Sequence, residues 1–218
     1  MSANTAARLR LTEIFHSLQG ESTRAGLPTV FVRLTGCPLR CVWCDTAHAF
    51  HGGATVTVAD VLDQVATFRC STVCVTGGEP LAQKTCLDLL AALCDAGYSV
   101  SLETSGALDI GAVDARVARI MDIKAPDSRE AARNRWENIS LLNDRDEVKF
   151  VLASRADYEW AVTTLHEHRL DRRCTVLFSP VQGLLAPEQL AQWILDDHLP
   201  IRFQLQLHKV LWGNAQGR

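Results

Sequence analysis

Short apolar runs rich in β-branched residues alternate along the chain with stretches whose apolar residues recur at helical spacing. Such alternation is typical of strand–helix–strand units, which build a parallel sheet with helices packed outside it. The apolar runs predict strands at 28–35, 72–76, 98–103, 118–123, 147–152, 174–178 and 201–207. The helical spacing predicts helices within 58–68, 86–94 and 190–194. The predicted fold is therefore α/β, a partial parallel β/α barrel that is open and trimmed.

The chemically unusual residues follow the predicted strands rather than precede them. They occupy positions 37–45, 77–80, 103–106, 122–124 and 179–180. In a parallel β/α sheet the carboxyl ends of the strands meet at one edge, where active sites are built. We therefore expect one shared site at this edge.

Length and composition limit the organisation of the protein. A chain of 218 residues with 47% hydrophobic and 22% charged residues supports one substantial core, so we expect a single domain over residues 1–218. The net charge is −3 and the basic residues are scattered, which disfavours a nucleic-acid partner. Residues 1–10 lack the apolar core of a signal peptide, and no run of eighteen apolar residues occurs. We expect a soluble cytoplasmic protein without a membrane partner.

Three of the eight cysteines lie together in a segment rich in loop residues, with the spacing C-x3-C-x2-C. They are Cys37, Cys41 and Cys44. A 4Fe-4S cluster held entirely by protein needs four cysteines, so three ligands leave one iron open. That iron can bind the amino and carboxylate groups of S-adenosylmethionine and place its sulfonium beside the electron source.

The cysteines also allow other interpretations than a cluster. Zinc could be bound by the three thiolates together with His48, although structural zinc sites usually pair two ligands in each of two knuckles. Cys70 and Cys74 have a similar offset, but Cys74 lies within an apolar strand and no third thiol follows. The remaining cysteines also lie in apolar patterns, where free cysteine behaves as a small hydrophobic residue.

The cysteine triad followed by Gly-Gly-Glu-Pro resembles the radical S-adenosylmethionine superfamily. Within it, the sequence is similar to the 7-carboxy-7-deazaguanine synthase family. The triad and Gly-Gly-Glu-Pro indicate only the superfamily, whereas Leu-Gln-Gly-Glu and Trp-Cys-Asp-Thr are much more specific to this family. The resemblance spans nearly the whole chain and is carried by residues 13–21, 31–37, 43–46, 76–80, 103–106 and 206–209.

The resemblance implies a reaction, cofactors and partners. The family converts 6-carboxy-5,6,7,8-tetrahydropterin into 7-carboxy-7-deazaguanine with loss of ammonia, a step toward queuosine and related deazapurines. An adenosyl radical removes a hydrogen at C6, the ring contracts, and the hydrogen is returned. The implied cofactors are a 4Fe-4S cluster, S-adenosylmethionine and Mg²⁺. A homodimer and a reducing partner such as flavodoxin or ferredoxin are also implied.

The resemblance assigns pterin contacts and a magnesium ligand. Thr46 corresponds to the magnesium ligand of the family, although an N-cap or turn threonine is the alternative. Arg33 lies in an apolar strand, so its charge needs a partner, either the substrate carboxylate or an internal carboxylate such as Glu13 or Glu21. The substrate contacts implied are Leu18, Gln19, Gly20, Glu21, Arg33, Thr76 and His208.

The resemblance also assigns contacts to S-adenosylmethionine. Gly77 and Gly78 would let the strand end approach the cofactor where a Cβ would intrude, and Glu79 would hold its methionine end. Family members often have Ser-Pro-Lys where this chain has Asp122, Ile123 and Lys124. The role of the family's lysine is therefore carried over to Lys124 more firmly than the roles of its two neighbours. The contacts implied are Gly78, Glu79, Glu103, Ser105, Asp122, Ile123, Lys124, Ser179 and Pro180. His208 and Lys209 are expected to close the last strand at the same edge.

Two other functions remain open from the sequence. An activase that generates a glycyl radical on a partner protein shares the cysteine spacing and a similar length, but has no need of the segment 18–21 or of Thr46. A non-catalytic metal-binding module would form no deoxyadenosine and would hold zinc or an inert cluster.

Overall fold

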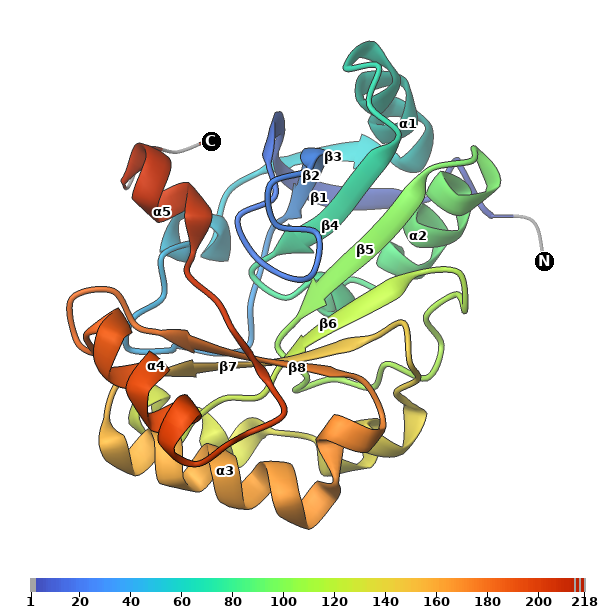
Figure 1. Ribbon diagram of the computed structural model, residues 1–218. Coiled ribbons are helices and arrows are strands. Elements are labelled where there is room, and N and C mark those ends of the chain that lie inside the picture. The colour runs from blue at the N-terminus through green and yellow to red at the C-terminus, as the bar shows by residue number, and fades with distance from the viewer. Residues whose placement is uncertain (1–2, 214, 216, 218) are drawn as a thin grey trace.

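A single open sheet of nine strands organises the computed structural model, which describes residues 3–213, 215 and 217 (Figure 1). The strand order is β3-β1-β2-β4-β5-β6-β7-β8-β9, and β3 and β9 form the two edges, so the sheet does not close. All neighbours from β2 to β9 are parallel, whereas β1 is antiparallel to both β2 and β3. The strands are β1 Arg8–Leu18, β2 Pro28–Leu34, β3 Ala54–Thr57, β4 Thr72–Gly77, β5 Ser99–Thr104, β6 Ala118–Asp122, β7 Glu147–Leu152, β8 Thr175–Pro180 and β9 Arg202–Phe203.

Four helices cover the outer face of the curved sheet, and a fifth lies near the C-terminal end on the other side (Figure 1). They are α1 Val58–Thr67, α2 Cys86–Asp95, α3 Arg155–His168, α4 Pro187–Asp196 and α5 Leu207–Trp212. Thr57 caps the start of helix α1: its hydroxyl accepts from the Asp60 amide, while the Asp60 carboxylate accepts from the Thr57 amide. This capping box satisfies backbone donors that the first turn would leave unpaired. None of the described helices is both long and apolar enough to cross a membrane.

The core explains why the central strands read as continuous apolar runs. Strand β4 is buried over Val73–Thr76, and its Val73 and Val75 pack in the same apolar cluster as residues of α1 and α2. Val75 and Leu102 on neighbouring strands and Leu90 on α2 are fully buried in the same apolar cluster. Burial of each such side chain contributes about 1.5–3 kcal/mol, so this core fixes the strand ends from which the site is built.

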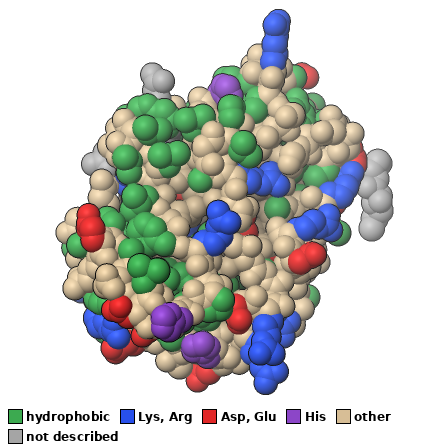
Figure 2. Space-filling view, in the orientation of Figure 1, with side chains coloured by type: hydrophobic (Ala, Val, Ile, Leu, Met, Phe, Trp, Pro, Cys, Tyr) green, Lys and Arg blue, Asp and Glu red, His purple; other side chains and the backbone are tan. Residues whose placement is uncertain are grey.

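The open α/β architecture predicted from the sequence is confirmed, but several elements differ. Strands β1 and β3 and helices α3 and α5 were not predicted, and within the described segment 105–117 no helix links β5 to β6. The last strand is only Arg202–Phe203, because the chain then leaves the sheet and the Gln204 side chain pairs with both backbone groups of Ser22. On the face in Figure 2, acidic and basic side chains are interspersed.

Candidate active site

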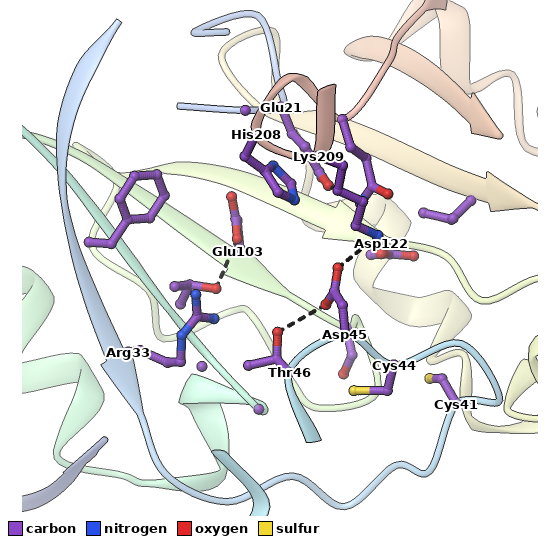
Figure 3. A pocket seen from close by; sticks show the side chains of 18 of the residues that line it. Glu21, Arg33, Cys41, Cys44, Asp45, Thr46, Glu103, Asp122, His208 and Lys209 are labelled. Atoms are coloured by element: carbon purple, nitrogen blue, oxygen red, sulfur yellow. Dashed lines mark hydrogen bonds and ion pairs between the residues drawn. The ribbon is translucent and has the colours of Figure 1, made fainter. Parts of the chain in front are cut away.

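A cavity of about 660 Å³ lies at the carboxyl ends of the parallel strands. Its walls come from the loop after β2, from β4 to β7 and from α5, which are far apart in the sequence (Figure 3). Their convergence follows from the parallel sheet, because all its strands end at the same edge. The predicted shared site is therefore one continuous space.

The loop between β2 and the 3-10 helix η1 (Ala47–Phe50) carries the three cysteines into this cavity. The Leu39 amide donates to Cys37 Sγ at 3.4 Å. The Arg40 guanidinium donates to the carbonyl oxygens of Cys37 and Leu39 and lies 4.3 Å from the centre of the Phe50 ring. These contacts fix the loop backbone, so the thiols are held on a preformed scaffold.

Gly77 and Gly78 allow the end of β4 to pass directly beneath this loop. A Cβ on Gly78 would lie 2.4 Å from the Gly36 carbonyl oxygen and 2.7 Å from Cys37 Cβ. A Cβ on Gly77 would lie 2.3 Å from the carbonyl oxygen of Leu34. The sequence predicted that these glycines leave room for S-adenosylmethionine. In the structure a Cβ on Gly77 would meet the end of β2 and one on Gly78 would meet the cysteine loop, and both glycines line the cavity.

The described residues offer no ready site for a single zinc ion. Among the described residues no three His, Cys, Asp or Glu side chains converge as one zinc ion requires. His48, the fourth ligand of the zinc alternative, instead has Nε2 3.4 Å from Glu13 Oε1. The cysteines of a 4Fe-4S cluster each bind a different iron, so they need not lie close enough together to share a single ion. Burial raises the pKa of the Cys37 and Cys41 thiols and so disfavours the thiolate form. Binding to iron would stabilise that thiolate form.

Strand ends opposite the cysteines present a hydrogen-bonded carboxylate. Thr76 Oγ1 donates to Glu103 Oε2 at 2.8 Å, and Gln19 Nε2 donates to Glu103 Oε1 at 3.3 Å. Leu18 and Gly20 line the same wall, next to Gln19. Glu103 is therefore oriented from both sides before any ligand binds.

Arg33 reaches the cavity from β2 and already has one internal partner. Its Nε donates to Glu13 Oε1 at 2.7 Å, and its guanidinium lies 5.7 Å from the centre of the Phe15 ring. The internal pair with Glu13, one of the two alternatives from the sequence, is therefore present. The bond uses Nε, which leaves the two terminal nitrogens available to a bidentate anion.

Four charged side chains alternate in sign across the cavity wall. Lys149 on β7 contacts Glu21 Oε2 and lies 3.3 Å from Asp122 Oδ2, which in turn lies 3.1 Å from Lys124 Nζ. Burial raises the pKa of Glu21, but Lys149 and the Gln206 amide outweigh it, so that pKa is lowered. Burial lowers the pKa of Lys149 and of Lys124, but the neighbouring carboxylates reverse the effect and raise both pKa values. Glu21, Lys124 and Lys149 are therefore charged at neutral pH.

Helix α5 closes the cavity through an ion pair with the cysteine loop. Lys209 Nζ lies 3.0 Å from Asp45 Oδ2, and Thr46 Oγ1 donates to Asp45 Oδ1 at 2.9 Å (Figure 3). Burial raises the pKa of Asp45, but Lys209 and Thr46 hold it at about 2. Thr46 also stands at the N-cap of η1, where its side chain makes no capping hydrogen bond. Its hydroxyl donates to Asp45 instead, and the residue lines the cavity.

Comparisons with known proteins decide the family. The profile described as the Radical SAM superfamily matches residues 31–182. A 7-carboxy-7-deazaguanine synthase from Chlorobaculum tepidum is 47% identical over 98% of this chain and 99% of that protein, and one from Koribacter versatilis is 39% identical over 94% and 97%. The chain belongs to the 7-carboxy-7-deazaguanine synthase family. The crystal structure of QueE from Escherichia coli, 22% identical, shares its fold with a TM-score of 0.77 over 92% of this chain and 95% of QueE.

Most of the residues predicted from the family resemblance line the cavity, but four do not. Glu79 is fully buried, and its carboxylate accepts hydrogen bonds from the Ser105 amide and from the Thr104 hydroxyl. Ile123 packs in the hydrophobic core, and the hydroxyl of buried Ser179 donates to the Gln204 carbonyl. The four that lie behind the cavity wall are Glu79, Ile123, Ser179 and Pro180.

His208 lines the cavity but belongs to helix α5, so the prediction that it closes a strand is wrong. Strand β9 is too short to reach it, and the Leu207 amide donates to the Gly20 carbonyl at 2.9 Å, which turns the chain into α5. The His208 ring lies where a Cβ on Gly20 would stand, 2.1 Å from Nδ1. A side chain at position 20 would therefore displace His208.

Several cavity residues of this family member were not predicted. Lys149 had a usable signal, because a charge inside the apolar run 147–152 is the feature that singled out Arg33. Phe15, Phe31 and Gln206 lie in segments that carry the family resemblance, but nothing in the sequence marked these residues individually as site residues. Only the pairing of β1 with β2, and the path of the chain after β9, bring them to the site.

Proposed function

We propose that this protein converts 6-carboxy-5,6,7,8-tetrahydropterin into 7-carboxy-7-deazaguanine with loss of ammonia, in the biosynthesis of queuosine or related 7-deazapurines. One observation carries the proposal. A single cavity joins three thiols from one loop to a polar wall built from Gln19, Thr76 and Glu103. The names of relatives that span nearly the whole chain support the same reaction.

Cys37, Cys41 and Cys44 would hold a 4Fe-4S cluster with one iron open to S-adenosylmethionine. When bound, the cluster supplies one electron for reductive cleavage of this cofactor. Gly78, Glu103 and Ser105 line the adjoining wall, as do Asp122 and Lys124, and we assign cofactor contacts to these five residues. Glu79 would act from behind by orienting Ser105, and Ile123, Ser179 and Pro180 would support the wall.

The pterin would occupy the wall opposite the cysteines. The terminal nitrogens of Arg33 suit its carboxylate in bidentate geometry, while Leu18, Gln19, Gly20, Glu21, Thr76 and His208 would enclose the ring. The Thr46 hydroxyl beside the Asp45 carboxylate is a set of hard oxygen donors, which suits Mg²⁺ bound together with the substrate carboxylate.

The remaining partners are part of the same proposal. A one-electron carrier such as flavodoxin or ferredoxin would reduce the cluster, and the whole chain of residues 1–218 would act as one radical S-adenosylmethionine domain within a homodimer in the cytoplasm.

The test is incubation of anaerobically reconstituted protein with the carboxytetrahydropterin, S-adenosylmethionine, Mg²⁺ and a reductant. We expect the deazaguanine product, identified by mass, together with one equivalent of ammonia. Deoxyadenosine without the deazaguanine would contradict the proposed substrate and favour a glycyl-radical activase. Colourless protein that retains zinc and forms neither compound would favour a non-catalytic module.

A further inference from the structure

Lys149 lies in the cavity wall among three carboxylates and has no role in the assignments above. Its side chain is 11% exposed, its ammonium contacts Glu21, and Asp122 Oδ2 lies 3.3 Å away. Glu103 is the third carboxylate whose charge acts on it. A buried ammonium that faces a cavity needs such partners, because an unpaired charge there would be strongly unfavourable.

The chemistry of this ammonium argues against direct participation in bond making. Burial lowers the pKa of Lys149, but Glu21, Asp122 and Glu103 outweigh it and raise that pKa well above its usual value. A lysine that serves as a base or forms a Schiff base needs a lowered pKa. Lys149 therefore remains a cation and acts through the groups that it contacts.

We infer that Lys149 is a positioning residue that fixes the Glu21 carboxylate in the cavity and so determines how tightly the pterin binds. The inference rests on the proposed function. Each Glu21 oxygen has one partner, since Oε2 accepts from Lys149 and Oε1 accepts from Gln206 Nε2 at 2.6 Å. With both partners in place the carboxylate cannot rotate.

Lys149 is itself held from its other side. Asp122 bridges it to Lys124, with N–O distances of 3.3 Å and 3.1 Å, so the positions of these charges are mutually fixed. Asp122 Oδ1 is buried and has no hydrogen-bond partner among the described residues. Buried polar atoms are normally satisfied, so this oxygen indicates a donor on a bound ligand. These four charged residues thus present the fixed Glu21 carboxylate at one end, and Asp122 Oδ1 between the two lysines as an acceptor for a ligand.

Equilibrium binding of the carboxytetrahydropterin to anaerobically reconstituted enzyme tests the inference. Lys149→Met is expected to raise the Kd about tenfold to a hundredfold, as for loss of a hydrogen-bonded charge. Lys149→Arg keeps the charge and is expected to recover part of the affinity. In the double variant Lys149→Met/Glu21→Gln, the Kd should match that of Glu21→Gln alone, because Lys149 acts through Glu21.

A matched control separates positioning from stability. Arg119 and Asp146 form another buried pair between β6 and the start of β7, away from the cavity. Arg119→Met should therefore lower the melting temperature and leave the pterin Kd unchanged. If Lys149→Met does not fold, the pterin Kd of the double variant is compared with that of Glu21→Gln to test the inference. Neither of these two variants contains an unpaired Glu21 carboxylate.

The inference is wrong if Lys149→Met binds the pterin with the wild-type Kd, or if the losses add in the double variant. Wild-type enzyme that binds the pterin without forming the deazaguanine would contradict the proposed function alone. Wild-type enzyme that does not bind the pterin would overturn both.

Discussion

At the scale of single residues, the site depends on the close approach of the Gly78 backbone to the cysteine loop. Gly78→Ala would push a methyl group against the Gly36 carbonyl and Cys37 Cβ, at 2.4 Å and 2.7 Å, so the cysteine loop must shift. We expect iron and sulfide per chain after reconstitution to fall by half or more. Gly111→Ala is the control, because its nearest contact would be 3.1 Å and its φ is ordinary. Full iron content in Gly78→Ala would contradict this reading.

The Glu21 carboxylate gives a second prediction at this scale, for acid pH. The pKa of Glu21 is lowered from 4.5 in the folded protein, despite burial, because Lys149 and Gln206 stabilise the charged form. Its stabilisation is therefore present above pH 4.5 and is lost as pH falls through the lower folded-state value. Urea unfolding from pH 7 to pH 3 should show the difference in unfolding free energy between wild type and Glu21→Gln shrinking below pH 4.5. A difference that grows there would contradict the assignment.

At the scale of elements, the segment between β9 and α5 joins the pterin wall to the rest of the site. Gln204 Oε1 accepts from the Ser22 amide at 3.0 Å, and its Nε2 donates to the Ser22 carbonyl at 2.9 Å. Gln204→Leu would leave the buried Ser22 amide unpaired, at about 1–3 kcal/mol, and would leave the Ser22 carbonyl with the Ala25 amide as its donor. We expect faster amide exchange in residues 19–27 and 204–213 together, with unchanged iron content.

Gln192→Leu provides the matched control for this element. Its side chain donates to Asp196 on exposed α4, so its loss should leave exchange near the cavity unchanged. Equal exchange in both variants would show that the segment after β9 is held by other contacts.

Helices and strands could be predicted from the sequence where their burial produces a clear local pattern of apolar residues. The runs that became β4 to β8 are apolar because they are buried on both faces. β1 alternates in burial only over its first four residues and is mostly of intermediate burial after them, and α3 mixes buried Tyr158 and Leu165 with Thr and His. Neither element therefore shows a clear period over its whole length. The cysteine triad and Arg33 were found from spacing and from a charge in an apolar run. His208 was placed in a strand because the Gly20 and Ser22 contacts that redirect the chain lie more than 180 residues away.

At the scale of the whole molecule, the proposed homodimer is directly measurable. The chain mass is 24.0 kDa, so sedimentation equilibrium of reconstituted protein should give about twice that value. A concentration-independent mass of one chain would contradict the dimer without affecting the radical chemistry.

The central claim is that Cys37, Cys41 and Cys44 together make this a radical S-adenosylmethionine enzyme. The most direct measurement is the rate of 7-carboxy-7-deazaguanine formation by the three single Cys→Ala variants. Cys70→Ala is the control, because that thiol donates to the backbone carbonyls of Pro28 and Thr72. Each triad variant should form no detectable product, and Cys70→Ala should retain the wild-type rate. Full-rate ring contraction by any triad variant would contradict the account.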